Sequence, residues 1–161
     1  MASAGRAPES DREDARFLEP KPIERIFNRI LGWFVGMGFG PAYCYLLEVR
    51  GRKSGRLFSL PVNLLEAQGK TFLVAPRGRT QWVRNAEASG RITLKKGSSR
   101  QGFALTSVPL SERPPILKAY LDTFKSVVQV YFPIPAGSPV EQFAGLAEDY
   151  PVFELLPGVS A

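Results

Sequence analysis

Between residues 43 and 108 the sequence consists of short apolar runs separated by turns that contain glycine. The turns GRKSG, AQGK and KGSSRQG carry residues that reverse a chain, and RITLK alternates apolar and polar side chains with a period of two. This alternation is typical of a strand with one buried face. We therefore expect mostly antiparallel strands, near residues 43–50, 57–66, 71–76, 91–96 and 101–108.

Two features refine this prediction. The run SLPVNL alternates in the same way, and Pro61 lies in its middle. Because proline cannot donate a hydrogen bond to a neighbouring strand, we expect Pro61 at a sheet edge or at a bulge. The run PVFELL near the C-terminus is predicted to form the last strand.

Helical patterns occur between and after the strands. Thr80 is predicted to cap a short helix that ends at Gly90. Ser111 is predicted to cap a longer helix, and Ser138 with Glu141 to form the capping box of another short one. This order indicates a mainly β fold with helices (α+β), built on a small β-barrel. The apolar stripe of the longer helix consists of Ile116, Leu117, Tyr120, Leu121, Phe124, Val127, Val128 and Tyr131.

The N-terminal part of the chain differs in composition. Residues 1–16 mix charged and small residues and are expected to be a disordered tail, whereas 17–161 have the size of one domain. Apolar residues at helical spacing predict an amphipathic helix over about 22–37. No secretory signal is visible, so we expect a cytoplasmic protein.

The uncharged run Ile30 to Leu47 approaches the length of a membrane span. Its glycines and Pro41 would break a helix in the second half, so we expect a short helix, a corner and a strand. Two interpretations of the predicted helix remain open. It caps the barrel, or its apolar face with Trp33 lies on the inner, anionic face of the cell membrane.

The chain contains no histidine and a single cysteine, Cys44. Histidine is the commonest general base near neutral pH and the commonest metal ligand, and one cysteine forms neither an internal disulfide nor a multi-cysteine site. We therefore expect no metal site and a buried, structural Cys44. If the protein is an enzyme, its chemistry belongs to a bound cofactor.

Two basic turns indicate an anionic ligand, in keeping with a formal charge of +6. In GRKSG, both glycines permit positive φ, so that backbone N–H groups can converge on an anion beside the basic side chains. In APRGRTQWVRN, a strand ends directly before a helix N-terminus, which also attracts anions. A solvated turn is the alternative for GRKSG taken alone. Two such sites suggest a long anionic ligand that spans both.

The ordered set GRKSG, LPV, VAPRG, WVRN and ITLKKG, within about residues 26–107, resembles the deazaflavin-dependent nitroreductase and quinone reductase family. The resemblance implies a split β-barrel of the flavin/deazaflavin-binding type that holds coenzyme F420, an 8-hydroxy-5-deazaflavin. It also implies hydride transfer to a quinone-like or nitroaromatic acceptor. The coenzyme-binding residues that it implies are Arg52, Lys53, Ser54, Arg56, Ser59, Pro61, Val62, Ala75, Pro76, Arg77, Gly78, Trp82 and Asn85.

The resemblance divides these residues by role. Arg52, Lys53 and Ser54 would meet the phosphodiester of the coenzyme tail, with Ala75 to Gly78 on the same side, and Arg56 would help to hold the negative charge of the tail, which also carries a polyglutamate. Ser59, Pro61 and Val62 would line the ring. Trp82 and Asn85 would pack beside it; taken alone, this pair is an aromatic core anchor with a hydrogen-bonding neighbour. Tyr131 is our candidate for a catalytic donor, and its alternative role is to end the helical stripe.

Other classes of function remain as alternatives. The same barrel could be a non-catalytic binder or carrier of a lipid-like ligand, or of FMN or heme. Lys95, Lys96 and Arg100 favour a nucleic-acid binder, but a solvated hairpin explains them and no aromatic–basic RNA motif appears, so we expect no nucleic-acid partner. The sequence leaves open whether the protein is a monomer or a homodimer.

Overall fold

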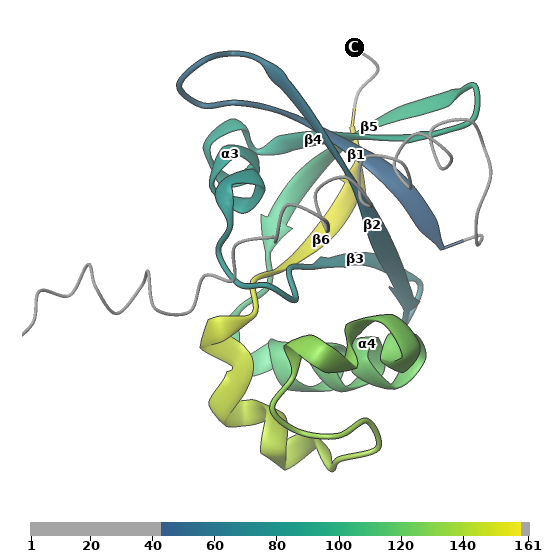
Figure 1. Cartoon of the computed structure of the whole chain (residues 1–161), viewed down its shortest axis with the longest axis vertical. Coiled ribbons are helices and arrows are strands. Elements are labelled where there is room, and N and C mark those ends of the chain that lie inside the picture. Colours follow the sequence, from purple (N-terminus) through teal and green to yellow (C-terminus); the bar gives the residue numbers. More distant parts are fainter. Residues whose placement is uncertain (1–42, 159–161) are drawn as a thin grey trace, which may run out of the picture.

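The computed structural model describes residues 43–158, and their strands form one closed antiparallel barrel in the order β1-β2-β3-β6-β5-β4 (Figure 1). The mainly β fold with helices that the sequence predicts is confirmed, and all of the expected strands are present. The predicted helix over about 22–37 and the tail 1–16 lie outside the described residues. The strands are β1 Cys44–Arg50, β2 Leu57–Ala67, β3 Lys70–Val74, β4 Arg91–Lys96, β5 Ser99–Ser107 and β6 Val152–Pro157.

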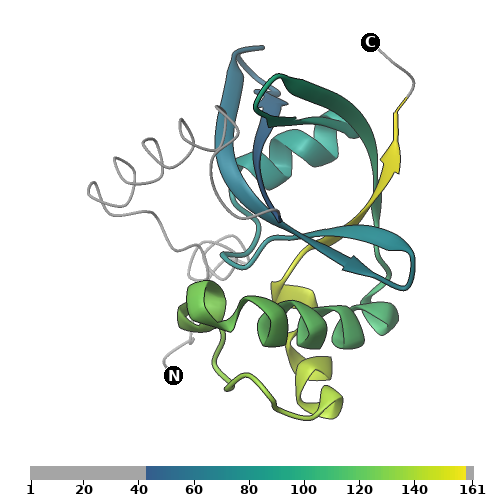
Figure 2. The same cartoon turned by 90° about the vertical axis from the view of Figure 1, so that its right-hand side faces the viewer.

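The inside of the barrel is filled by alternate residues of the strands. Leu47 and Val49 of β1 are almost completely buried, and they pack with side chains from β2, β3, β4 and β6. Helix α3 (Gln81–Ser89) contributes Val83 and Ala86 to the same core. Figure 2 shows the ring of strands with α3 within its outline. One face of the helix therefore packs against the barrel core, and Gln81 and Glu87 lie on its exposed side.

A second core lies on the outer face of β2, β3 and β6. Helix α4 (Arg113–Val128) packs Leu117 and Leu121 there, against Phe72 and Val74 of β3. The chain continues through two 3₁₀ segments, η2 (Gln129–Tyr131) and η3 (Val140–Asp149), before β6. The rings of Phe132 and Tyr150 stack with their centroids 4.5 Å apart, which joins this layer to the start of β6.

The helix ends confirm the predicted bounds of one helix and contradict the predicted side-chain caps. Thr80 and Gly90, at φ 68°, flank α3 as predicted, but the hydroxyl of Thr80 makes no capping hydrogen bond. Ser111 instead lies in a 3₁₀ turn, η1 (Leu110–Glu112), and Glu112 precedes α4. Ser138 donates to the carbonyl of Pro135, so the predicted capping box is absent and η3 is a 3₁₀ helix. A proline lies at the start of both elements, where its fixed φ defines the first turn without a side-chain cap.

Pro61 lies at a local edge, as the sequence predicts. It faces Leu46 of β1, whereas Leu64 donates to the carbonyl of Tyr43 three positions along. Hydrogen-bonded and non-bonded pairs alternate in an antiparallel ladder, so the nitrogen of Pro61 points away from β1. On that side β3 pairs only with residues 64–67 of β2. Within the described chain, residues 57–63 therefore have one open backbone edge.

Two expectations about the start of this region have clear outcomes. Cys44 is buried, and burial raises the pKa of its thiol, which agrees with a structural role. The strand predicted after the glycine-rich corner begins at Cys44. No helix within residues 43–158 is long and apolar enough to cross a membrane.

Candidate cofactor site

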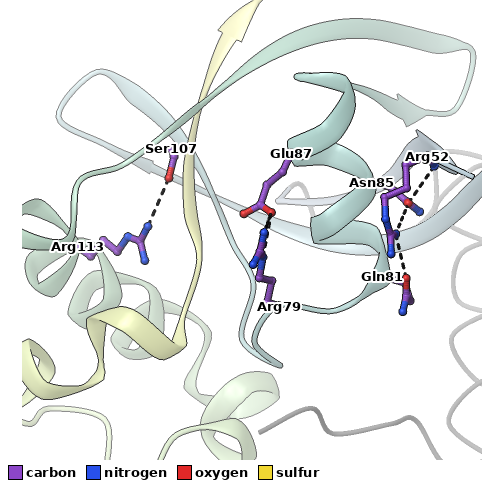
Figure 3. A network of polar contacts seen from close by, with 7 residues as sticks. All are labelled: Arg52, Arg79, Gln81, Asn85, Glu87, Ser107 and Arg113. Atoms are coloured by element: carbon purple, nitrogen blue, oxygen red, sulfur yellow. Dashed lines mark hydrogen bonds and ion pairs between the residues drawn. The ribbon is translucent and has the colours of Figure 1, made fainter. Parts of the chain in front are cut away.

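Arg52 connects the turn between β1 and β2 to helix α3. Its backbone N–H donates to Asn85 Oδ1 at 3.1 Å, and its Nη1 donates to the same oxygen at 2.8 Å. The same Nη1 also donates to Gln81 Oε1 at 3.0 Å. Figure 3 shows the three side chains converging. These hydrogen bonds hold the turn against the helix, so the turn is not simply a solvated loop.

The positive charge of Arg52 has no carboxylate partner among residues 43–158. The ion pairs of this part of the chain lie elsewhere, and both acceptors of Arg52 are neutral amides. An exposed arginine held by neutral groups keeps its full charge available to an anion. The ion pairs are Lys70–Glu154, Arg79–Glu87, Arg100–Glu48 and Lys118–Asp122.

The rest of the turn is exposed and closed by its own backbone. Gly51 N–H donates to the carbonyl of Arg56, and Gly55 N–H donates to that of Gly51. Gly55 has φ 70°, as predicted, but Gly51 does not have positive φ. A Cβ at Gly51 would lie 2.8 Å from the Phe58 ring and 2.8 Å from Ser54 Oγ, so close packing explains this glycine. The side chain of Lys53 is exposed to solvent, and so is the side of the turn that carries the Arg52 guanidinium.

The segment from Ala75 to Thr80 lies between β3 and α3. Gly78 has φ 81°, and its N–H donates to the carbonyl of Ala75 at 3.2 Å. Arg79 pairs with Glu87 of α3 at 2.8 Å, which ties the segment to the helix. The hydroxyl of Thr80 is buried and has no hydrogen-bond partner in the described chain, and the first turn of α3 has no acidic residue. These features leave the helix N-terminus suited to an anion.

Tyr131 lies beside this segment. The guanidinium carbon of Arg77 is 5.8 Å from the centroid of the Tyr131 ring, within the range of a cation–π contact. The hydroxyl of Tyr150 donates to the carbonyl of Tyr131 at 2.5 Å, which fixes the backbone of η2. The fold thus brings the predicted catalytic tyrosine next to a predicted coenzyme-binding residue, although 54 positions separate them in the chain (131 − 77).

The remaining predicted residues occupy two different faces. Val62 packs against the barrel interior, and strand alternation places Ser59 and Pro61 on the outer face. Trp82 is half-buried against the barrel core, and Asn85 is 6% exposed. The side chains of Ser59, Pro61 and Val62 therefore cannot all contact one side of a ring. The backbone groups of Ser59 and Pro61 point to the open edge of β2, whereas those of Val62 point to β1.

Two residues of this region are absent from the sequence-based set. Gln81 holds Arg52, and Glu87 holds Arg79. A signal for Gln81 exists, because positions four apart share a helix face and Gln81 precedes Asn85 by four. Nothing in the sequence indicates that the turn at Arg52 meets that face.

Solved structures share the fold at low identity. The protein Atu2129 of unknown function from Agrobacterium tumefaciens has 17% identity and a TM-score of 0.52, covering 87% of this chain and 57% of its own. A domain-swapped dimer has 18% identity and a TM-score of 0.50, covering 83% and 96%. The F420-H2 dependent reductase FDR-A has 19% identity and a TM-score of 0.47, covering 71% and 95%. No curated protein matches the chain.

A family model gives the more specific result. The model of the F420H(2)-dependent quinone reductases matches residues 24–131, which is more than half of the 161 residues. This stretch includes the turn at Arg52, the segment from Ala75 to Thr80, α3 and Tyr131. The split-barrel fold and the family that the sequence predicts are therefore confirmed, and the chain belongs to the F420H(2)-dependent quinone reductase family.

Proposed function

We propose that this protein transfers a hydride from reduced coenzyme F420 to a quinone-like or nitroaromatic acceptor. One observation carries the proposal beyond family membership. The basic corner formed by the turn 51–56, the segment 75–80 and the N-terminus of α3 presents Arg52 without a carboxylate partner in residues 43–158. The anionic tail of the coenzyme would supply the negatively charged partner that this corner lacks.

The residues present fit such a tail. Arg52 is held in place, whereas Lys53 and Arg56 are exposed beside it, so three positive charges lie within five residues. The buried hydroxyl of Thr80 lacks a partner in the described chain and is a donor for an oxyanion. When bound, the reduced deazaflavin supplies the hydride from its C5 carbon, which agrees with a chain that contains no histidine.

The chain's own residues would bind and orient the coenzyme. Arg52, Lys53, Ser54 and Arg56 would hold the anionic tail, together with the segment from Ala75 to Gly78. The open edge of β2 offers the backbone N–H and carbonyl of Ser59 and the carbonyl of Pro61 for the polar edge of a ring, and Val62 would line the ring with its side chain. Trp82 would pack beside the ring, and Asn85 would act through Arg52, because its Oδ1 already accepts two hydrogen bonds.

Tyr131 would donate a hydrogen bond to the negative charge that develops on the acceptor. A fixed donor aimed at developing charge lowers the barrier more than one that must reorganise. Its backbone is held by Tyr150 and its ring by Arg77, so its position depends on the same segment that would bind the tail. The acceptor and the coenzyme would therefore meet near η2 and the segment 75–80.

Titration of the purified protein with F420, followed by coenzyme fluorescence, tests the proposal directly. We expect binding at micromolar concentrations, and then oxidation of the reduced coenzyme by a soluble quinone or a nitroaromatic compound. No binding in this range would refute the proposal. A pigment or lipid retained on purification would support a binder or carrier of FMN, heme or a lipid-like ligand instead. Sedimentation measurements would distinguish a monomer from a homodimer.

A further inference from the structure

We infer that Gln81 and Asn85 are positioning residues that hold Arg52 by one nitrogen and leave one edge of its guanidinium open for a bidentate oxyanion. The inference rests on the proposed function and deepens it, because it assigns a specific recognition geometry to the anionic tail. In this role both amides act through Arg52 and do not have to contact the coenzyme themselves.

The hydrogen-bond inventory of Arg52 carries the inference. Nη1 has two hydrogens, and its two bonds go to Gln81 Oε1 at 3.0 Å and Asn85 Oδ1 at 2.8 Å. Nη1 is therefore saturated. Nε and Nη2 carry the other three hydrogens, and neither atom has a hydrogen bond or ion pair within residues 43–158. The Nε–Nη2 edge is the side of a guanidinium that matches a carboxylate or phosphate with two parallel bonds.

Asn85 fixes the position of Arg52. Asn85 is only 6% exposed, and its Oδ1 accepts from both the backbone and the side chain of Arg52. Two bonds to one buried oxygen set the position of the backbone and the direction of the guanidinium together. The open edge therefore does not have to be ordered when a ligand binds, which reduces the entropic cost of binding.

Helix α3 assigns different acceptors to its two arginine partners. Arg79 contacts Glu87, whose carboxylate accepts from both Nε and Nη2 of that arginine. Arg52 contacts only the amides of Gln81 and Asn85 (Figure 3). A carboxylate neutralises its arginine, whereas an amide orients it and leaves its charge intact. The helix thus neutralises Arg79 and occupies its fork, and it keeps Arg52 available.

Exchange of each amide for its carboxylic acid tests this role. Gln81→Glu is the main variant, because Gln81 is exposed and the change retains an acceptor oxygen at the same place. Asn85→Asp is the second variant. We expect the dissociation constant for F420 to rise about tenfold in each, with a weaker dependence of binding on salt, because Arg52 is neutralised. The melting temperature of Gln81→Glu should stay at the wild-type value.

A matched control adds the same charge elsewhere. Gln142 is exposed on η3, in the layer that packs against α4, and Gln142→Glu should leave coenzyme binding unchanged. A general effect of net charge would weaken binding equally in Gln81→Glu and Gln142→Glu, and this result would overturn the inference. Wild-type affinity in both Gln81→Glu and Asn85→Asp would also overturn it, while leaving the proposed function intact.

A second measurement keeps the inference testable if wild-type protein does not bind F420, which would refute the proposed function. The Nε–H resonance of Arg52 can be followed by NMR during titration with dimethyl phosphate and, separately, with an oligoglutamate. A shift with one of these probes that is lost in Gln81→Glu supports the inference and identifies phosphodiester or carboxylate as the partner. No shift with either probe in the wild type overturns it.

Discussion

Arg52 and Arg113 anchor two different regions of the molecule, and they differ in how many donors they keep. Arg113 donates from Nε to the carbonyl of Val108 at 2.8 Å and from Nη1 to that of Ala147 at 3.0 Å. Its Nη2 donates to Ser107 Oγ at 3.4 Å. All three nitrogens are therefore engaged, whereas Arg52 uses only Nη1 of its guanidinium (Figure 3).

The comparison separates a structural arginine from one that is available to a ligand. Burial lowers the pKa of Arg113, although the group stays protonated, and its bonds join the end of β5 to η3. Arg52 is exposed and joins only the turn to α3. We therefore expect loss of Arg113 to affect folding and loss of Arg52 to affect binding. The following variants test this division, from the largest expected effect to the smallest.

Arg113→Ala should give the largest loss of stability. Two part-buried backbone carbonyls lose their partner, whereas the exposed hydroxyl of Ser107 can bond to water, and a buried acceptor left unsatisfied costs about 1–3 kcal/mol. We expect the free energy of unfolding to fall by about 3 kcal/mol in urea titrations. The folded fraction should bind F420 with wild-type affinity. Weaker coenzyme binding at unchanged stability would contradict the division between the two arginines.

Arg52→Ala combined with Lys53→Ala should give the reverse result. Both side chains are exposed, so we expect the free energy of unfolding to change by less than about 1 kcal/mol. Coenzyme affinity should fall by about 2–3 kcal/mol, because a hydrogen bond to a charged group contributes about 1.5–3. Fluorescence titration measures the affinity, and Lys70→Ala, on the distant β2–β3 hairpin, is the control. Unchanged affinity would place the anion site elsewhere.

The difference between the regions also explains what the sequence could predict. The strands, the turns and the helix between Thr80 and Gly90 depend on local periodicity and turn chemistry, and these predictions are confirmed. The basic turn at Arg52 was recognisable for the same reason. Two predicted caps, at Ser111 and Ser138, are wrong because nearby prolines define the helix starts without them.

The partners of Arg52 could not be predicted in the same way. Gln81 and Asn85 are 29 and 33 positions away from it, so their contact depends on how α3 packs against the barrel. The proximity of Arg77 and Tyr131 depends likewise on the path of the chain through α4 and η2. Local patterns indicate which residue types can bind an anion. Only the tertiary packing determines which of their donors remain open.

Tyr131→Phe tests whether the region beside Arg77 serves the reaction. Phenylalanine keeps the ring that contacts the Arg77 guanidinium but removes the hydroxyl. We expect kcat for quinone reduction to fall about 100-fold, the lower end of the usual range for loss of a positioned donor, with the coenzyme dissociation constant unchanged. Stopped-flow measurement of coenzyme oxidation gives kcat. Unchanged kcat would assign Tyr131 to the packing of η2 alone.

We expect the smallest effect on stability at Asp122 of α4, in the same region as the structural residue Arg113. Hydrogen bonds from the Gly137 N–H and from Lys118 lower the pKa of its carboxyl in the folded state. A carboxyl whose pKa is lower in the folded than in the unfolded state stabilises the fold above its unfolded pKa, near 3.9. This contribution is lost as the pH falls through the folded pKa.

Asp122→Asn should therefore lower the free energy of unfolding at neutral pH by only about a few tenths of a kcal/mol, since solvent screens this partly exposed group. Asparagine keeps an acceptor for the Gly137 N–H, so the charge and the hydrogen bond from Lys118 are removed. The difference from wild type should begin to shrink as the pH falls below about 4 and should vanish below the folded pKa of Asp122, where both side chains are neutral. Urea titrations at successive pH values measure it. At each of these pH values the variant should bind the coenzyme as tightly as the wild type does. The Asp122 carboxylate orders the layer around α4 and not the corner at Arg52.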